Sequence, residues 1–218
     1  MALLRWTVGV VLLSLFLPGG LLPGGLLPEG TLREAGNPGV VRAQNETGKP
    51  PPASVRPGEQ LAPFVATPML VVEKMLEMAE VTARDAVYDL GSGDGRILLR
   101  AAEKYGAKAV GVEMDAHLVQ ESRRKARELN LEDLVTIVQG DLLQTNLKPA
   151  TVVTIYLLPE ATEKLRPLLE RDLSPGARVV AHHARVPGWR AAREEAVRIG
   201  DNTHFVYLYR IPDAFQRN

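Results

Sequence analysis

Residues 89–95 of this 218-residue chain read Asp-Leu-Gly-Ser-Gly-Asp-Gly, and the interpretation of the whole fold starts from them. Residues 86–88, Ala-Val-Tyr, form a short apolar segment typical of a β-strand. Residues 96–105 have the pattern of a helix that ends at Gly106. A strand, a glycine-rich turn and a helix bring backbone N–H groups and a helix N-terminus up to a ligand. Glycine is needed there because a Cβ would block the approach and because such turns often require a positive φ.

The spacing of the glycines narrows the choice of ligand. A dinucleotide-binding turn requires Gly-x-Gly-x-x-Gly, and its third glycine would fall at Arg96. Instead, Gly91, Gly93 and Gly95 alternate, and Asp89 stands two residues ahead of them. This pattern resembles motif I of the class I S-adenosylmethionine (AdoMet)-dependent methyltransferases. An NAD-dependent oxidoreductase remains the alternative for the same strand–turn–helix pattern.

The composition is that of a globular protein without an excess of either charge. Hydrophobic residues make up 45% of the chain, and its length gives room for one domain plus an appendage. Lys plus Arg number 26 and Asp plus Glu number 26, so no bulk positive field favours a nucleic-acid partner. The absence of cysteine excludes disulfides, thiolate zinc sites and cysteine nucleophiles. We therefore expect no nucleic-acid partner and no metal.

Residues 1–60 do not read as part of the folded core. Arg5 precedes an apolar run, residues 6–17, which has the length of a signal peptide and is short for a membrane span. A Pro/Gly-rich polar tract follows, and such a composition cannot bury enough apolar surface to order itself. We divide the chain into residues 1–60, a signal-like segment with a disordered linker, and residues 61–218, the methyltransferase domain. Export or membrane anchoring is the expected location, with a cytoplasmic enzyme as the alternative.

Two further acidic residues follow predicted strands. Glu113 ends the second strand about 20 residues beyond the glycine turn, where a carboxylate can accept hydrogen bonds from both ribose hydroxyls. Asp141 follows the third strand and can accept a hydrogen bond from the exocyclic amine of adenine, with Leu142 as an apolar wall. Since Asp89, Glu113 and Asp141 follow three successive strands, we expect them to surround one nucleoside.

The other segments complete an α/β pattern. Thr67 and Pro68 predict the start of a helix, with the Thr67 hydroxyl as N-cap and proline at the first helical position. Asp115 is the expected N-cap of a helix that runs to Leu129. Residues 151–158 form an apolar run typical of a central strand buried on both faces. The predicted strands are residues 86–88, 108–112, 135–139, 151–158, 177–181, 194–199 and 204–211, the last two forming an antiparallel hairpin.

The helix that Asp115 caps carries four basic side chains, Arg123, Arg124, Lys125 and Arg127. No aromatic residues interleave with them, and two glutamates dilute their charge. We interpret them as a solvated helix face and not as a nucleic-acid patch.

Several stretches make the resemblance more specific. They are Thr67-Pro68, residues 71–76 (Val-Val-Glu-Lys-Met-Leu), residues 88–96, Gly111-Val112-Glu113 and residues 150–159 (Ala-Thr-Val-Val-Thr-Ile-Tyr-Leu-Leu-Pro). Together they resemble the bacterial relatives of the mitochondrial lysine methyltransferases that modify the ATP synthase c-subunit and the adenine nucleotide translocase. The resemblance covers roughly residues 64–212. It implies an α/β, doubly wound, Rossmann-like fold with a mostly parallel seven-stranded sheet and a C-terminal antiparallel hairpin.

The same resemblance implies AdoMet as donor and a protein lysine as acceptor, in the eukaryotic members a lysine of a membrane protein. Bacterial members tend to have Ser-His and an acidic residue after the fifth strand, whereas residues 181–184 here are Ala-His-His-Ala. The acceptor side is therefore not carried over. The residues expected to bind AdoMet are Asp89, Gly91, Ser92, Gly93, Gly95, Glu113, Asp141, Leu142 and Thr67.

Three residues are candidates to line the acceptor pocket. Thr154, Tyr156 and His182 lie at or near the C-terminal ends of predicted strands, where ligands of open α/β sheets bind. The alternative is that one of His182 and His183 points to solvent and the other makes a local hydrogen bond. A metal site at this histidine pair lacks further ligands at a plausible spacing.

Methyl transfer requires the acceptor lone pair to be aligned with the S–CH₃ bond, and an amine acceptor must first lose a proton. A desolvating pocket would favour the neutral amine. The expected partners are an acceptor, with a membrane protein among the candidates, and a membrane at the N-terminal segment. A non-catalytic exported AdoMet-binding module and a small-molecule acceptor stay open, and the sequence does not predict the oligomeric state.

Overall fold

The computed structural model of the protein describes residues 65–215. The signal-like segment and linker expected in residues 1–60 lie outside the described residues. None of the helices between residues 65 and 215 combines the length and the apolar character needed to cross a membrane.

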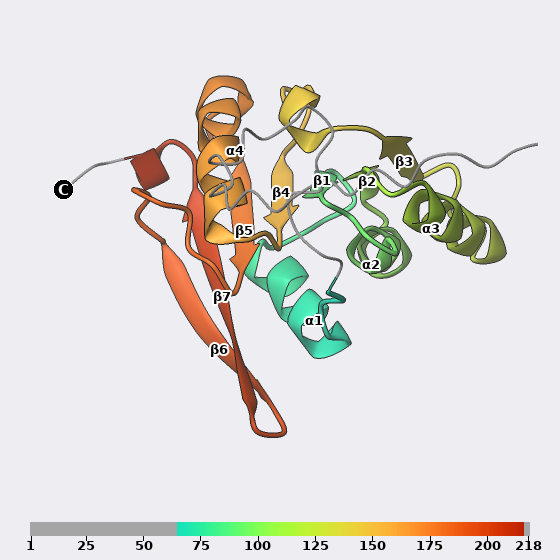
Figure 1. Ribbon diagram of the computed structural model, residues 1–218, viewed down its shortest axis with the longest axis horizontal. Helices are drawn as coiled ribbons and strands as arrows, with labels where there is room; N and C mark the ends of the chain where they lie inside the picture. The colour runs from blue at the N-terminus through green and yellow to red at the C-terminus, as the bar shows by residue number, and fades with distance from the viewer. Residues whose placement is uncertain (1–64, 216–218) are drawn as a thin grey trace, which may run out of the picture. The chain divides into compact units, whose positions relative to one another are not determined.

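Seven strands form one sheet in the order β3-β2-β1-β4-β5-β7-β6 (Figure 1). The first five run parallel, while β7 runs antiparallel to both β5 and β6. The topology confirms the predicted mostly parallel sheet with its C-terminal hairpin. The strands are β1 (Ala86–Leu90), β2 (Lys108–Glu113), β3 (Val135–Gln139), β4 (Val152–Ile155), β5 (Arg178–His182), β6 (Arg193–Ile199) and β7 (Asn202–Arg210).

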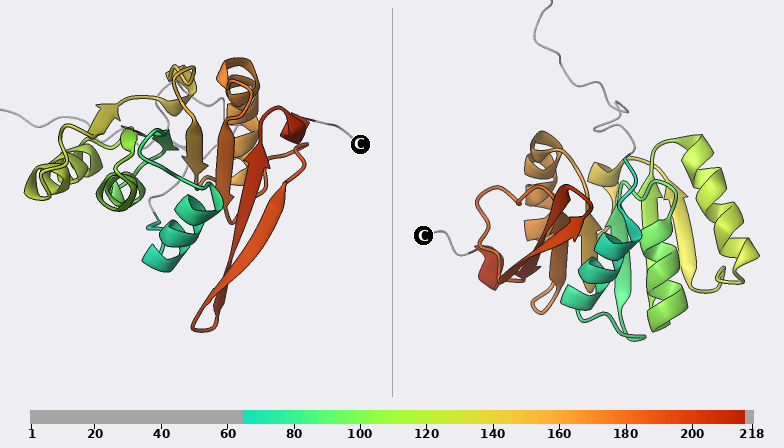
Figure 2. Two further views of the ribbon diagram at one scale, coloured as in Figure 1. Left: turned by 180° about the vertical axis from the view of Figure 1, so that it is seen from behind. Right: turned by 90° about the horizontal axis from the view of Figure 1, so that it is seen from below.

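Helices cover both faces of the sheet (Figure 2). On one face lie α1 (Met69–Met78), α2 (Arg96–Tyr105) and α3 (Ala116–Glu128). On the other lies α4 (Pro159–Asp172), with the short 3₁₀ helices η1 (Leu142–Gln144) and η2 (Asp213–Phe215) beside it. The helices pack through apolar faces, since the buried residues of α1 recur at helical spacing.

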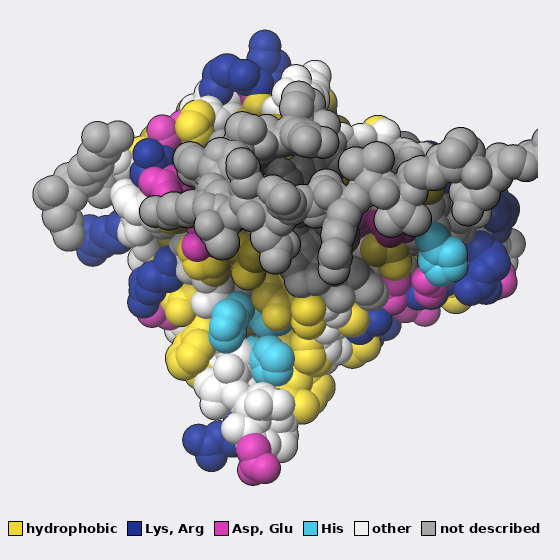
Figure 3. All heavy atoms as spheres, viewed as in Figure 1, with side chains coloured by type: hydrophobic (Ala, Val, Ile, Leu, Met, Phe, Trp, Pro, Cys, Tyr) yellow, Lys and Arg dark blue, Asp and Glu magenta, His cyan; other side chains and the backbone are white. Residues whose placement is uncertain are grey.

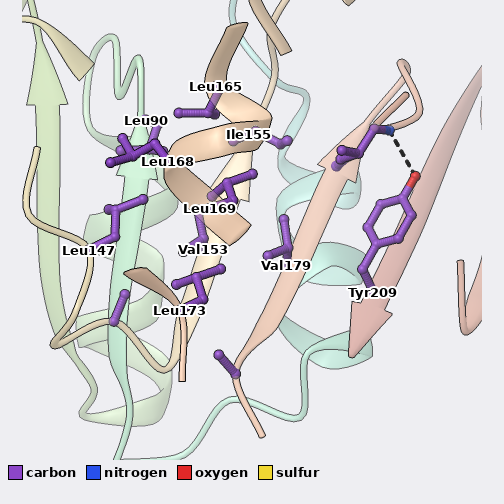
Figure 4. Packing of buried hydrophobic residues seen from close by; sticks show 14 of the residues in the cluster. Leu90, Leu147, Val153, Ile155, Leu165, Leu168, Leu169, Leu173, Val179 and Tyr209 are labelled. Atoms are coloured by element: carbon purple, nitrogen blue, oxygen red, sulfur yellow. Dashed lines mark hydrogen bonds between the residues drawn. The ribbon is translucent and has the colours of Figure 1, made fainter. Parts of the chain in front are cut away.

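The central strand β4 is buried on both sides, as its apolar sequence predicts. Val152 packs into the core under α1 and α2, whereas Val153 and Ile155 pack into the core under α4. Figure 4 shows leucines of α4, among them Leu165 and Leu169, pointing into the second of these cores.

Several predicted boundaries differ from the structure, and at two of them a tertiary contact outweighs a local pattern. A strand is predicted over residues 151–158, but β4 ends at Ile155. The apolar sequence extends beyond the strand, and Leu157 packs into the core under α4. The helix after Thr67 begins at Met69, and no side chain caps it. The Thr67 hydroxyl lies 3.3 Å from Nδ1 of His182 instead of capping the helix.

Close packing at two glycines fixes where the turn after β1 lies. A Cβ at Gly95 would lie 2.0 Å from the Ser122 hydroxyl of α3, and Gly95 also has a φ of 79°. A Cβ at Gly111 of β2 would lie 2.3 Å from Leu98 and 2.6 Å from the Ser92 hydroxyl. Only glycine at these positions allows α2 and the turn to lie so close to β2 and α3.

Candidate active site

The glycine turn lies across the C-terminal end of β2. The N–H groups of Gly91 and Ser92 both donate to the carbonyl of Val112, at 2.9 and 3.1 Å. Gly91, Gly93 and Gly95 all have positive φ, at 82°, 54° and 79°. Gly91 is exposed, so the turn presents backbone without a side chain at the edge of the sheet where ligands of such folds bind.

Asp89, the last residue but one of β1, is buried with 3% of its surface exposed. Its Oδ1 accepts a 2.7 Å hydrogen bond from the Thr154 hydroxyl. Burial raises the pKa of the Asp89 carboxyl to about 7; the Thr154 hydrogen bond opposes this rise, and the charges of Glu113 and Asp94 add to it. A positive charge placed beside Asp89 would favour the ionised carboxylate, so the site fits a cationic ligand.

Glu113 is held by backbone N–H groups at the end of β2. Its Oε2 accepts from Gly93 at 2.8 Å, and its Oε1 accepts from Met114 at 2.8 Å and Asp115 at 2.9 Å. A carboxylate has about four acceptor positions. The sequence predicts that Glu113 binds both ribose hydroxyls, but this arrangement leaves an acceptor position for one of them on Oε2.

Asp141 follows β3 and lies beside Glu113 along the edge of the sheet. The N–H of Gly140 donates to the Glu113 carbonyl at 2.9 Å, which joins the ends of β2 and β3. Oδ1 of Asp141 accepts from Leu143 at 2.9 Å, and Leu142 is buried in the core under α4. Asp89 near the end of β1, Glu113 at the end of β2 and Asp141 just after β3 therefore lie at the same edge of three adjacent strands, as the sequence predicts.

An ion-paired cluster that the sequence did not reveal supports the turn. Asp94 bonds to Arg96 at 2.8 Å and to Lys125 at 2.9 Å. Burial acts to raise the pKa of Asp94, but the hydrogen bonds from Arg96 and Lys125 outweigh it and hold the pKa at about 2. Lys125 thus binds the turn, and its prediction as part of a solvated helix face is wrong. Arg96 also donates to the carbonyl of Thr67 at 3.0 Å, which ties the segment before α1 to the turn.

A buried histidine lies at the end of β5, where the acceptor pocket is expected. His182, at the end of β5, is 1% exposed, and its ring centroid lies 4.0 Å from that of Tyr156. Its Nδ1 lies 3.3 Å from the Thr67 hydroxyl and its Nε2 lies 3.0 Å from Nδ1 of His204. Burial, together with the charges of His204 and His183, lowers the pKa of His182 to about 4, so its ring is neutral near pH 7. Figure 3 shows histidines gathered between the hydrophobic surfaces of α1 and of the β6–β7 hairpin.

The structure separates the three candidates for the acceptor pocket. Tyr156 and His182 lie together, with ring centroids 4.0 Å apart, and their role as lining of an acceptor pocket stays a prediction. The Thr154 side chain is fully buried and its hydroxyl donates to Asp89, so the only role that the described part of the structure gives it is at the donor motif. His183 is exposed, as the alternative interpretation expected of one histidine, but the partners of His182 are distant in sequence and not local.

Sequence reasoning missed His204 because nothing in the hairpin pattern marks it. It approaches His182 only because β7 pairs with β5 in a register that places His182 opposite Val206. Within residues 65–215, no three His, Cys, Asp or Glu side chains are arranged to hold a metal ion.

The site fits a cationic nucleoside on three observations. The turn exposes the backbone of Gly91, which carries no side chain. A positive charge would stabilise the ionised form of the buried Asp89 carboxyl. The Ser92 hydroxyl is buried without a hydrogen-bond partner in the described part of the chain. At the ends of β4 and β5, the ring of Tyr156 lies against the neutral imidazole of His182.

Comparison with known proteins identifies relatives over most of the described region. The model of a family described as the ANTKMT methyltransferase domain matches residues 89–193. A protein-lysine N-methyltransferase of Saccharolobus islandicus is 42% identical over 148 residues, which cover 67% of this chain and 92% of that protein. The human lysine N-methyltransferase of the ATP synthase c-subunit is 34% identical over 127 residues, 58% of this chain and 54% of that protein. The chain thus matches about half the length of the human enzyme.

A solved structure is similar in both sequence and fold. It is described as an RNA methyltransferase from Salinibacter ruber in complex with S-adenosyl-L-homocysteine. It is 47% identical, with a TM-score of 0.64, and the match covers 68% of this chain and 95% of that one. None of these similarities supports the NAD-dependent oxidoreductase alternative.

Proposed function

This chain belongs to the family of class I AdoMet-dependent methyltransferases that includes the protein-lysine N-methyltransferase of Saccharolobus islandicus, and we propose that its acceptor is the side-chain amine of a protein lysine. It is a methyltransferase with AdoMet as the methyl donor. The observation that carries the proposed acceptor is the 42% identity to that enzyme over 92% of its length.

The proposed donor site comprises the turn and the three acids. Asp89 faces the positive charge, the glycine backbone approaches the ligand, and Glu113 accepts from a ribose hydroxyl. Asp141 accepts from adenine, with Leu142 as an apolar wall. The other proposed contacts are Ser92, whose buried hydroxyl lacks a partner among the described residues, and Thr67, which Arg96 ties to the turn.

Methyl transfer requires the protein to align the acceptor nitrogen with the S–CH₃ bond and to bind the amine in its neutral form. Bound AdoMet supplies a methyl group attached to a positively charged sulfur. Loss of the methyl group leaves the sulfur as a neutral thioether. A free lysine amine has a pKa of about 10.4, so at pH 7 nearly all of it is protonated and lacks a lone pair. The ring of Tyr156 and the neutral ring of His182 border the acceptor side without a formal charge, and such surroundings favour the neutral amine.

An RNA acceptor is the second candidate, because the 47% identical structure is described as an RNA methyltransferase. The charges of this chain argue for protein instead. Basic and acidic residues balance at 26 each. Next to the site, the charges of Arg96 and Lys125 are balanced by those of Asp94 and Glu121, so they do not form a positive surface for phosphates.

A labelled-methyl assay separates these acceptors. The purified chain is incubated with methyl-labelled AdoMet and either membrane proteins, soluble proteins or total RNA. We expect protease-sensitive label that hydrolyses to methyllysine, lost in Glu113→Ala and retained in Glu103→Ala, an exposed glutamate on α2. Nuclease-sensitive label would show RNA as the acceptor, and label in neither polymer would also overturn the lysine proposal.

We propose further that the N-terminal apolar run, residues 6–17, exports the protein or anchors it to a membrane. The support is Arg5 followed by an apolar run of signal-peptide length. A membrane-protein acceptor would agree with this location and with the relative named for the ATP synthase c-subunit. Cell fractionation of the full chain, with and without residues 1–60, tests it. Recovery of both forms in the cytoplasm would contradict it.

A further inference from the structure

A row of three side chains connects the donor turn with the C-terminal hairpin. It starts at Thr67, whose carbonyl accepts from Arg96 of the turn and whose hydroxyl lies 3.3 Å from Nδ1 of His182. It continues from Nε2 of His182 to Nδ1 of His204, 3.0 Å away. We call Thr67, His182 and His204 the histidine relay. Its inner members are 4% and 1% exposed, whereas His204 is half-buried and reaches solvent.

The hydrogen bonds allow protons to move along this row. A neutral imidazole has one N–H donor and one acceptor nitrogen. When Nε2 of His182 carries the proton and donates to His204, Nδ1 accepts from the Thr67 hydroxyl. The Thr67 oxygen then has free lone pairs for another donor. When His182 gains the Thr67 hydroxyl proton at Nδ1 and gives its own Nε2 proton to Nδ1 of His204, one proton passes from Thr67 to His204 and the buried ring stays neutral.

In the described part of the chain, Glu77 of α1, Glu195 of β6 and Asp94 of the glycine turn are each paired with a basic side chain. On α1 and β6, Lys74 pairs with Glu77 at 3.2 Å and with Glu195 at 3.1 Å. At the turn, Asp94 is paired with Arg96 and Lys125. Tyr156 contacts the ring of His182 from the end of β4, and exposed His183 lies edge-on to it.

We propose that the histidine relay takes the proton from the acceptor ammonium; this inference rests on the proposed lysine acceptor. An ammonium N–H passes its proton to the Thr67 oxygen as the Thr67 hydroxyl proton moves to Nδ1 of His182. The Nε2 proton of His182 moves to Nδ1 of His204, which becomes an imidazolium and then releases its Nε2 proton to water. The amine lone pair forms the N–C bond to the methyl carbon as the C–S bond breaks, and that electron pair stays on sulfur.

The substitution His204→Gln tests the relay, because an amide keeps a hydrogen-bonding side chain but takes up no proton. Proton transfer by a positioned side chain typically contributes 10²- to 10⁴-fold, so we expect kcat/KM for lysine methylation at pH 7 to fall about 10²-fold. The defect should shrink as pH rises toward about 10, since more of the lysine then arrives as neutral amine. AdoMet binding measured by calorimetry should not change. His117→Gln, an exposed histidine on α3, is the matched control and should match the wild type at every pH.

A second pair of variants tests the inner end. Thr67→Ser keeps the hydroxyl and should keep the wild-type pH profile, whereas Thr67→Val should show the pH-dependent defect of His204→Gln. A defect of the same size at every pH, or no defect at pH 7, would overturn the relay. Failure of the proposed function is a separate result, because it appears in the wild-type protein as the absence of methyllysine.

Discussion

Thr154 and Asp89 stand opposite each other on β4 and β1, and the Thr154 hydroxyl donates a 2.7 Å hydrogen bond to the buried Asp89 carboxyl. This hydrogen bond joins Asp89, the first residue of the glycine motif, to β4, the strand that precedes Tyr156. It also lowers the proton affinity of that acid, because it opposes the larger rise in pKa that burial causes.

We expect AdoMet affinity to rise with pH between about 6 and 8. The pKa of Asp89 in the free protein is about 7, so below that pH the carboxyl is mostly neutral and does not attract a cation. A bound positive charge favours the ionised form, and the dissociation constant should fall by up to about tenfold per pH unit until Asp89 is ionised without ligand. Calorimetric titrations from pH 5.5 to 8.5 measure this. Asp89→Asn should bind weakly and lose this component of the pH dependence; an unchanged profile would contradict the assignment.

Replacing Thr154 by valine should shift this profile toward higher pH. Valine removes the hydroxyl that lowers the pKa of Asp89 while keeping a similar shape, so more alkaline conditions are needed for ionisation. Thr154→Ser should stay close to the wild type. Because the Thr154 hydroxyl donates to Asp89, KM for the acceptor at pH 8.5 and saturating AdoMet should not change in either variant. An altered KM with a normal AdoMet profile would place Thr154 on the acceptor side after all.

Gly111→Ala should destabilise the protein by about 1–3 kcal/mol, the usual cost of forcing an extra methyl into a packed core. The new Cβ would lie 2.3 Å from Leu98 and 2.6 Å from the Ser92 hydroxyl, so α2 and the turn must move. Gly140→Ala is the matched control, since a Cβ there meets no atom within 4 Å. Urea unfolding of both variants measures the difference, and equal midpoints would contradict the packing described here.

Tyr209→Phe should lower the free energy of unfolding by about 1–3 kcal/mol, the cost of leaving a buried polar group without a partner. The Tyr209 hydroxyl accepts a 3.0 Å hydrogen bond from the backbone of Val186, drawn as the dashed line in Figure 4. Tyr207→Phe is the control on the same strand, because its hydroxyl makes no hydrogen bond to another of residues 65–215. Thermal unfolding distinguishes them; a larger loss in the control would count against the role of Tyr209.

The sequence predicts the donor side well because its signals are local. The turn at residues 89–95 carries its own glycines, and each acid follows its own apolar strand. The N-cap at Asp115 is confirmed, with its side chain accepting from His117 and Leu118. Which of these residues contact AdoMet stays a prediction.

Contacts that join distant segments are predicted less well, at the glycine turn as well as around His182. Thr67 has the local pattern of a helix cap, yet its hydroxyl pairs with a side chain 115 positions away. Lys125 belongs to a run of basic residues but bonds to Asp94 in the turn. His204 meets His182 through the register of a hairpin, which no short motif encodes.

The inner place of β7 has a consequence for the order in which the protein takes shape on the ribosome. A nascent chain that has emerged only as far as β6 leaves the backbone of β5 unpaired on one side, because β7 lies between these two strands. His182 also lacks its contact with His204 until β7 has been synthesised. The strands that carry Asp89, Glu113 and Asp141 can pair early in translation, whereas the surroundings of His182 are completed last, by β7.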